Sequence, residues 1–189
     1  MDYIYRMESY LESIRKQFEY YKGLGDKTFE QLSFDELQNE IAQDANSIAI
    51  ITKHLSGNML SRWTNFLTED GEKPSRNRNR EFDDTFETKD QLLESWNTGW
   101  DCLFNAIKPL TESDLERIVY IRNEGHTVTE AINRQLAHYS YHIGQIVFLG
   151  KIFKGKDWQI LSIPKGASKA YNDKKFSEEK SRKHFTNGL

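Results

Sequence analysis

The chain has a single cysteine among its 189 residues, Cys102. A lone thiol cannot form an internal disulfide, and it excludes metal sites built from several thiolates, such as two CxxC pairs. Any metal ion bound by this chain must therefore be held by histidine, with carboxylate or water as further ligands.

Long apolar runs are also missing. The longest one, residues 48–51, is far too short to cross a bilayer. The first six residues, MDYIYR, show no signal-peptide pattern. We therefore expect a soluble, cytoplasmic protein that does not associate with membranes.

The net charge of -3 offers no general attraction to nucleic acid. Beyond Lys151 the chain is basic, with nine lysines and arginines against four acids, but it has no nucleic-acid-binding motif. A chain of this length forms one well-cored domain. We expect a single domain over residues 1–172, including a C-terminal extension that packs on it, and a polar basic tail over 173–189.

Helical patterns dominate the chain. We expect a first helix from residue 7 to about 22, ended by Gly23 and Gly25. Three capping boxes then indicate helix starts, because a serine or threonine oxygen accepts a free backbone N–H and the acid or amide three residues on reaches back. They predict a second helix from Ser33 to about Leu55, a third from Thr88 to near Pro109, and a fourth from about Val128 to Phe153.

The segments between these helices have a different composition. Residues 56–84 are rich in Gly, Asn, Asp and Arg and show neither a helical nor a strand period, which predicts a long surface loop between the second and third helices. Residues 118–128 contain a short β-type run followed by a turn, typical of a small hairpin before the fourth helix. Together these features predict an all-α four-helix bundle.

Two histidines, His138 and His142, lie four residues apart on the fourth predicted helix. Side chains at i and i+4 stand on the same helix face, so both imidazoles can reach one metal ion if that face points inward. Without other information such a pair is more often a hydrogen-bonded or surface pair. A divalent ion also needs a third ligand from elsewhere, and in a bundle His54 of the second helix can supply it.

The order of one histidine late in the second helix and HxxxH in the fourth resembles the DinB-like superfamily of metal-binding bundles, which includes bacillithiol- and mycothiol-dependent transferases. The stretches NRQLAHYSYHIGQ (133–145) and WQILSIPKGAS (158–168) are similar to a bacterial branch of unknown function. The resemblance runs from the first helix to about residue 172. It implies a DinB-like bundle, a divalent metal site at His54, His138 and His142, and a homodimer.

Three further residues are candidates for supporting this site. Gln145 and Arg134 lie one turn on either side of the histidine pair and are expected to orient a bound water, an anionic substrate or the second ring nitrogen of a ligand. A buried polar network that closes the bundle is an equal alternative. Tyr139 stands where zinc proteases of the HExxH type carry their catalytic glutamate, so that mechanism lacks its base. His126 and His184 are expected on the surface.

The expected activity follows from three neutral imidazoles, which leave a divalent ion its full charge. The leading hypothesis is a metal-dependent S-transferase that joins a small thiol, bacillithiol by resemblance, to an electrophilic small molecule. The alternatives are a non-enzymatic metal- or ligand-binding stress protein and a metal-dependent hydrolase. Zinc or nickel is the expected ion, although a histidine site also accepts cobalt, copper or iron.

Overall fold

The structure is a computed structural model that describes residues 2–43, 45–83 and 86–187. Its α-helices are α1 (Asp2–Gln31), α2 (Phe34–Gln38), α3 (Ile48–Trp63), α4 (Lys89–Ile107), α5 (Val128–Lys154) and α6 (Ser168–Phe176). Short 3-10 turns are η1 (Asn79–Glu81), η2 (Glu112–Asp114) and η3 (Gly155–Asp157). Strands β1 (Ile118–Ile121) and β2 (Glu124–Thr127) form one antiparallel hairpin.

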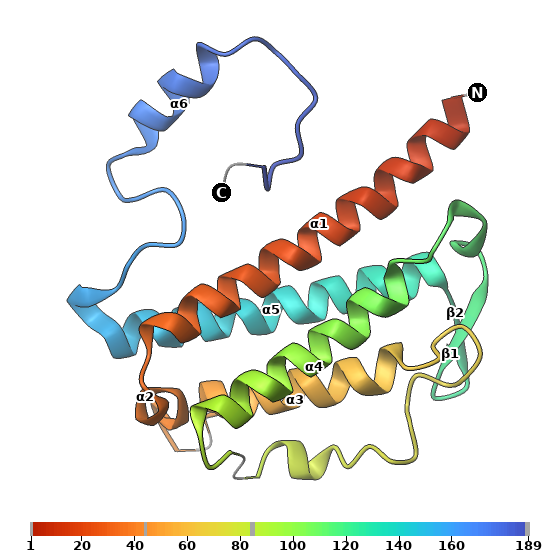
Figure 1. Ribbon diagram of the computed structural model, residues 1–189, viewed down its shortest axis with the longest axis horizontal. Helices are drawn as coiled ribbons and strands as arrows, with labels where there is room; N and C mark the ends of the chain where they lie inside the picture. Colours follow the sequence, from red (N-terminus) through yellow and green to blue (C-terminus); the bar gives the residue numbers. More distant parts are fainter. Residues whose placement is uncertain (1, 44, 84–85, 188–189) are drawn as a thin grey trace.

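The long helices α1, α3, α4 and α5 form a bundle, with the hairpin at one end (Figure 1). Helix α3 packs mainly against α4, and α1 packs mainly against α5. This arrangement confirms the expected all-α bundle, its long connection before α4 and its hairpin before α5. Within the described residues, no helix has the length and hydropathy that a membrane span requires.

Aromatic side chains from all four long helices meet in the core. Phe18 of α1 contacts both Trp63 of α3 and Trp100 of α4 edge-on, and Trp100 also contacts Tyr139 of α5. All four rings are at most 3% exposed. Edge-to-face aromatic packing stabilises a core beyond the area it buries, so this cluster fixes the relative positions of the helices.

The prediction that the first helix ends at Gly23 and Gly25 is wrong, because α1 continues to Gln31. Gly25 packs directly against Trp96 of α4, where a larger residue has no room. Beyond it, Phe29 and Leu32 are buried in the core. Burial of these later side chains outweighs the low helix propensity of the two glycines.

The predicted second helix is two helices. The capping box at Ser33 is present, but α2 that it begins ends at Gln38. Helix α3 starts nine residues after Asn39, where the hydroxyl of Ser47 accepts the backbone N–H of Ile50. Ile41, which lies within the predicted second helix, is 50% exposed and outside α2 and α3. Because α3 runs on to Trp63, the predicted loop starts eight residues later than expected.

The remaining boundaries agree with the sequence. Thr88 caps α4 through the backbone N–H of Gln91, and Thr127 forms a capping box with Glu130 at the start of α5. Helix α4 ends at Ile107, two residues before Pro109, and α5 ends before Gly155. The caps depend on contacts between residues within one turn of the helix start, so the sequence alone reveals them.

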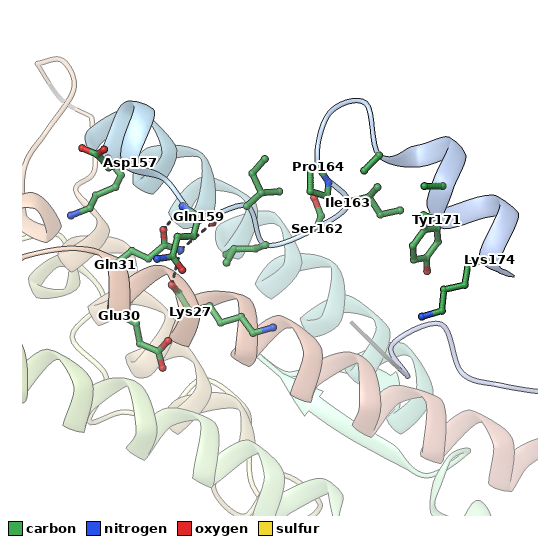
Figure 2. Close-up of a pocket in the computed structure, with 15 residues that line it drawn as sticks. Lys27, Glu30, Gln31, Asp157, Gln159, Ser162, Ile163, Pro164, Tyr171 and Lys174 are labelled. Carbon is green, nitrogen blue, oxygen red and sulfur yellow. Dashed lines mark hydrogen bonds between the residues drawn. The ribbon is translucent and has the colours of Figure 1, made fainter.

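The C-terminal extension is attached at its beginning. Trp158 lies against Gly150 of α5, and Gln31 exchanges two hydrogen bonds with the backbone of Gln159 (Figure 2). Farther along, Ile160 and Ile163 are 52% and 39% exposed. The tryptophan therefore attaches the start of the extension to the bundle, whereas the two isoleucines remain partly exposed to solvent.

Two glycines of α1 provide a matched stability test. A Cβ on Gly25 would lie 2.5 Å from the Trp96 ring, which is 1% exposed and held by a hydrogen bond to Asp26, whereas a Cβ on Gly23 meets nothing within 4 Å. We expect Gly25→Ala to lower the free energy of unfolding by about 1–3 kcal/mol through overpacking. Gly23→Ala should raise it by about 0.5–1 kcal/mol because alanine favours helix. Urea unfolding of both variants measures the difference, and equal effects would contradict this packing.

Candidate functional site

The three expected histidines come together on one side of the bundle. His54 projects from the middle of α3, and His138 and His142 project from adjacent turns of α5. Their ligand nitrogens all lie within 4.8 Å of one another. His138 Nε2 is 3.3 Å from His54 Nε2 and 3.1 Å from His142 Nε2. The helical spacing places the pair, and the packing of α3 beside α5 brings in the third ring.

Two of these rings are oriented through their other nitrogen. His54 Nδ1 lies 2.9 Å from a carboxylate oxygen of Glu81, and His142 Nδ1 lies 2.7 Å from the amide oxygen of Gln145. Both oxygens only accept hydrogen bonds, so each Nδ1 carries the proton and donates it. The Nε2 atoms of His54 and His142 are therefore left with lone pairs that face His138.

This arrangement fits a metal ion better than it fits a hydrogen-bonded cluster. His138 Nε2 can carry one proton, which satisfies only one of its two close neighbours. The other contact then has no proton between its two nitrogens and forms no hydrogen bond. A zinc ion with Zn–N bonds of about 2.0–2.1 Å in tetrahedral geometry separates its ligand nitrogens by roughly 3.3 Å, close to both observed contacts. The donor set and its spacing suit a divalent cation.

Electrostatics favour the neutral form of His138 and His142. Burial, the neighbouring His142 and His54, and the guanidinium groups of Arg62 and Arg76 lower the pKa of His138 to about 3. Burial also lowers the pKa of His142, although its hydrogen bond to Gln145 opposes this. Imidazoles bind metals in their neutral form. Both helix α5 rings are thus ready to act as ligands at neutral pH.

Glu81 is a site residue that the sequence did not reveal. It ends η1 in the long loop and is 5% exposed. Burial raises the pKa of Glu81, but hydrogen bonds from His54 and Arg76 outweigh this and leave the pKa below its ordinary value. Arg76 donates from Nε and Nη2, at 2.7 and 2.9 Å. Nothing in the irregular composition of the loop distinguished this glutamate from its neighbours.

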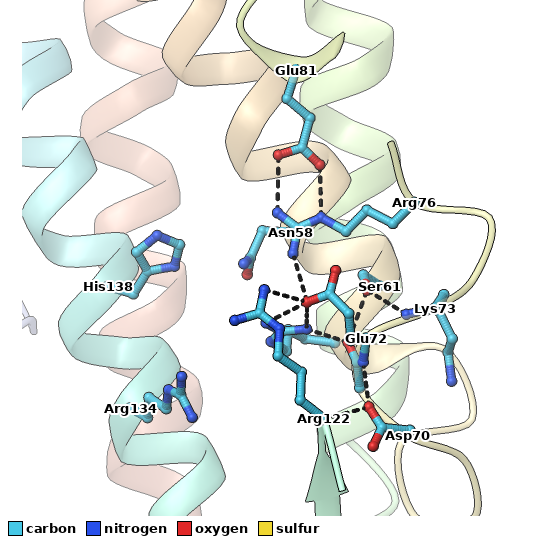
Figure 3. A network of polar contacts seen from close by, with 12 residues as sticks. Asn58, Ser61, Asp70, Glu72, Lys73, Arg76, Glu81, Arg122, Arg134 and His138 are labelled. Atoms are coloured by element: carbon cyan, nitrogen blue, oxygen red, sulfur yellow. Dashed lines mark hydrogen bonds and ion pairs between the residues drawn. The ribbon is translucent and has the colours of Figure 1, made fainter. Parts of the chain in front are cut away.

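Beside the histidines, the loop carries a network of charged side chains (Figure 3). Glu72 accepts hydrogen bonds from Arg62 and Arg122 and also pairs with Arg76. Arg62 also donates a hydrogen bond to the backbone carbonyl of Gly71. The network joins α3, the loop and the hairpin around the open side of the site.

Tyr139 and Arg134, the two other candidates for supporting the site, have different surroundings. Tyr139 is fully buried, where it accepts a hydrogen bond from the Trp63 indole and donates one to Asn58. Burial raises its pKa far above the ordinary value, so it stays protonated. Arg134 is exposed, with Nη1 3.5 Å from His126 Nε2. Tyr139 is therefore part of the core. Arg134 instead lines a surface cavity that His138 also lines.

Fold and site define this protein as a helical bundle with a cluster of three histidines between two of its helices. Residues 6–167 match the family described as "Protein of unknown function (DUF1572)". Because the match covers most of the chain, the protein belongs to this family. No curated protein matches the sequence.

The tautomers of the cluster can be measured directly. In chelator-treated protein at pH 8, we expect long-range ¹H–¹⁵N NMR spectra to show protonated Nδ1 and unprotonated Nε2 in His54 and His142. Gln145→Ala should remove this preference in His142 because the acceptor is lost. Tyr141→Phe is the control, because it keeps the ring that packs edge-on against His142 at a centroid distance of 4.9 Å and removes only the hydroxyl that accepts from the amide nitrogen of Gln145. Protonated Nε2 in wild-type His142 would contradict the orientation of the ring.

Proposed function

We propose that His54, His138 and His142 bind one divalent metal ion, and that the protein is a metal-dependent S-transferase for a small thiol and an electrophile. The observation that carries the metal site is the convergence of three Nε2 atoms. In the neutral rings of His54 and His142, the hydrogen bond at Nδ1 leaves Nε2 with its lone pair. Zinc and nickel suit this all-nitrogen donor set best.

The residues around the cluster support this role. Glu81 and Gln145 hold two rings by their outer nitrogens, which is how ligand histidines are usually oriented. Phe82 stacks on the His54 ring at a centroid distance of 5.1 Å and limits its movement. When bound, a divalent ion with three neutral ligands supplies an open position at which a thiol loses its proton more readily.

The reaction proposed is a substitution. A carbon–sulfur bond forms between thiol and electrophile, the bond to the leaving group breaks, and the thiol proton passes to solvent. The HxxxH helix resembles that of DinB-like thiol transferases, and this resemblance supports the choice of reaction. It is also the basis for proposing that the protein is a member of the DinB-like superfamily and that its thiol is bacillithiol. The homodimer implied by the same resemblance stays a prediction.

The alternatives receive less support from the site. A hydrolase needs a free base, but the nearest buried carboxylate, Glu81, is already bound by Arg76 and His54. A purely structural metal is held by a closed set of four ligands, whereas the described residues supply a cluster of three. A cavity also opens beside His54 and His138, so small molecules can approach them.

Metal content is the first test. Protein purified without a histidine tag or chelator should contain near-stoichiometric zinc or nickel by inductively coupled plasma mass spectrometry. A His138→Ala/His142→Ala variant should lose it while circular dichroism still shows a folded helical protein. His126→Ala is the matched control, because that histidine lies outside the cluster. Wild-type protein that holds no metal, even after divalent ions are added back, would refute the site.

Transfer is tested with a chromogenic electrophile. Metal-loaded wild-type protein should accelerate thioether formation between a low-molecular-weight thiol, bacillithiol first, and 1-chloro-2,4-dinitrobenzene. His138→Ala should reduce the rate to that of the uncatalysed reaction, and His126→Ala should not. A metal-loaded protein that accelerates no reaction across a panel of thiols and electrophiles would favour the non-enzymatic binding protein.

A further inference from the structure

A cavity of about 320 Å³ adjoins the histidine cluster. His54 and His138 form part of its wall, together with Asn58 and Gln135. The rest of the wall consists of five arginines, Arg62, Arg76, Arg78, Arg122 and Arg134. Among the residues that the structure describes, no acid lines this cavity. Figure 3 shows His138 and Arg134 of α5 on one side and Arg76 and Arg122 on the other.

Three of the arginines have structural partners behind the wall. Arg62, Arg76 and Arg122 share the single carboxylate of Glu72, and Arg76 also binds Glu81. The two carboxylates of Glu72 and Glu81 thus pair with three guanidinium groups and one histidine. These ion pairs hold the loop on the bundle, so they explain why three of the five arginines are present.

The other two arginines have no such explanation. Among the side chains that the structure describes, in residues 10–43, 45–83 and 86–187, no carboxylate lies at ion-pair distance from Arg78 or Arg134. Arg78 lies over the Phe82 ring at 5.7 Å, and Arg134 reaches only His126. Both side chains are exposed at the mouth of the cavity. Their charges are available to a ligand without breaking an ion pair.

Two polar atoms beneath the cavity wall have no hydrogen-bond partner among the described residues: Nε of Arg62, which is 7% exposed, and Oε1 of Gln135, which is 3% exposed. One is a donor and the other is an acceptor, and both are buried, so they do not favour an anion over another ligand. The preference for an anion comes from the arginine charges that line the cavity.

We propose that this cavity binds an oxyanion, the carboxylate or phosphate group of the substrate, beside the three histidines. Guanidinium groups present forks of N–H donors that match the oxygens of either group. The role of the anion as part of a substrate rests on the proposed function, whereas its binding by the arginines does not depend on a metal.

The test uses two anions and one neutral analogue. Isothermal titration calorimetry measures the affinity of the full chain for succinate, inorganic phosphate and succinamide, with metal-loaded and with chelator-treated protein. The variant Arg78→Gln/Arg134→Gln removes the two arginines without unpairing a carboxylate. Arg80→Gln is the matched control, because Arg80 is an exposed arginine of the same loop that does not line the cavity.

We expect wild type and Arg80→Gln to bind succinate or phosphate and not succinamide. The double variant should bind the anion at least about tenfold more weakly, since each lost charge-assisted bond accounts for a factor of that order. The preferred anion then identifies the group as carboxylate or phosphate. Equal affinity in the double variant, or no binding of either anion, would overturn the inference. Anion binding by a protein that takes up no metal would refute the metal site alone.

Discussion

The buried carboxylate of Glu81 is the interaction on which the site depends. A charge at 5% exposure is expensive unless it is fully paired, and Glu81 meets this requirement with two bonds from Arg76 and one from His54. The same contacts hold the loop against α3 and fix the His54 ring. They need a close approach to the helix, which Gly57 permits, because a Cβ there would lie 2.5 Å from a Glu81 oxygen. The third histidine is therefore positioned by a residue outside the bundle core.

The charge balance around the three histidines would be unusual for a site that binds a cation. Three neutral imidazoles add no negative charge, and five arginines line the adjacent cavity. A divalent ion there raises the local positive charge further, and Coulomb repulsion is stronger in a partly buried site than in water. Nitrogen ligands tolerate this because their bonds to zinc or nickel do not depend on opposite charge. An anion in the cavity relieves the repulsion, so metal and anion should favour each other's binding.

Local signals in the sequence located most of the bundle, while contacts between distant segments decided the rest. The threonine caps at Thr88 and Thr127 and the His138–His142 pair depend on neighbouring residues only, and the structure has all of them. The continuation of α1 through Gly25 depends on Trp96, seventy-one residues away, which periodicity cannot detect. The break between α2 and α3 was hidden by apolar residues that mimic one helical stripe. Glu81 and the paired arginines lie in a stretch without periodicity, so only the folded chain shows their roles.

The two halves of the site are built differently. His138 and His142 stand on the rigid helix α5, and their separation is set by the helical repeat. Three of the five arginines, Arg76, Arg78 and Arg122, instead stand on the loop and the hairpin. These two segments are joined where Asp70 accepts the backbone N–H groups of Arg122 and Asn123. Both of these residues have positive φ, 56° and 61°, a strained conformation for a side chain as large as arginine. Their hydrogen bonds to Asp70 offset that strain and direct Arg122 to the cavity. Loops accept substitutions more readily than packed helices, so Arg78 and Arg122 can change while His138 and His142 stay in place. Under the proposed function, this construction separates the histidines that activate a substrate from the arginines that select it.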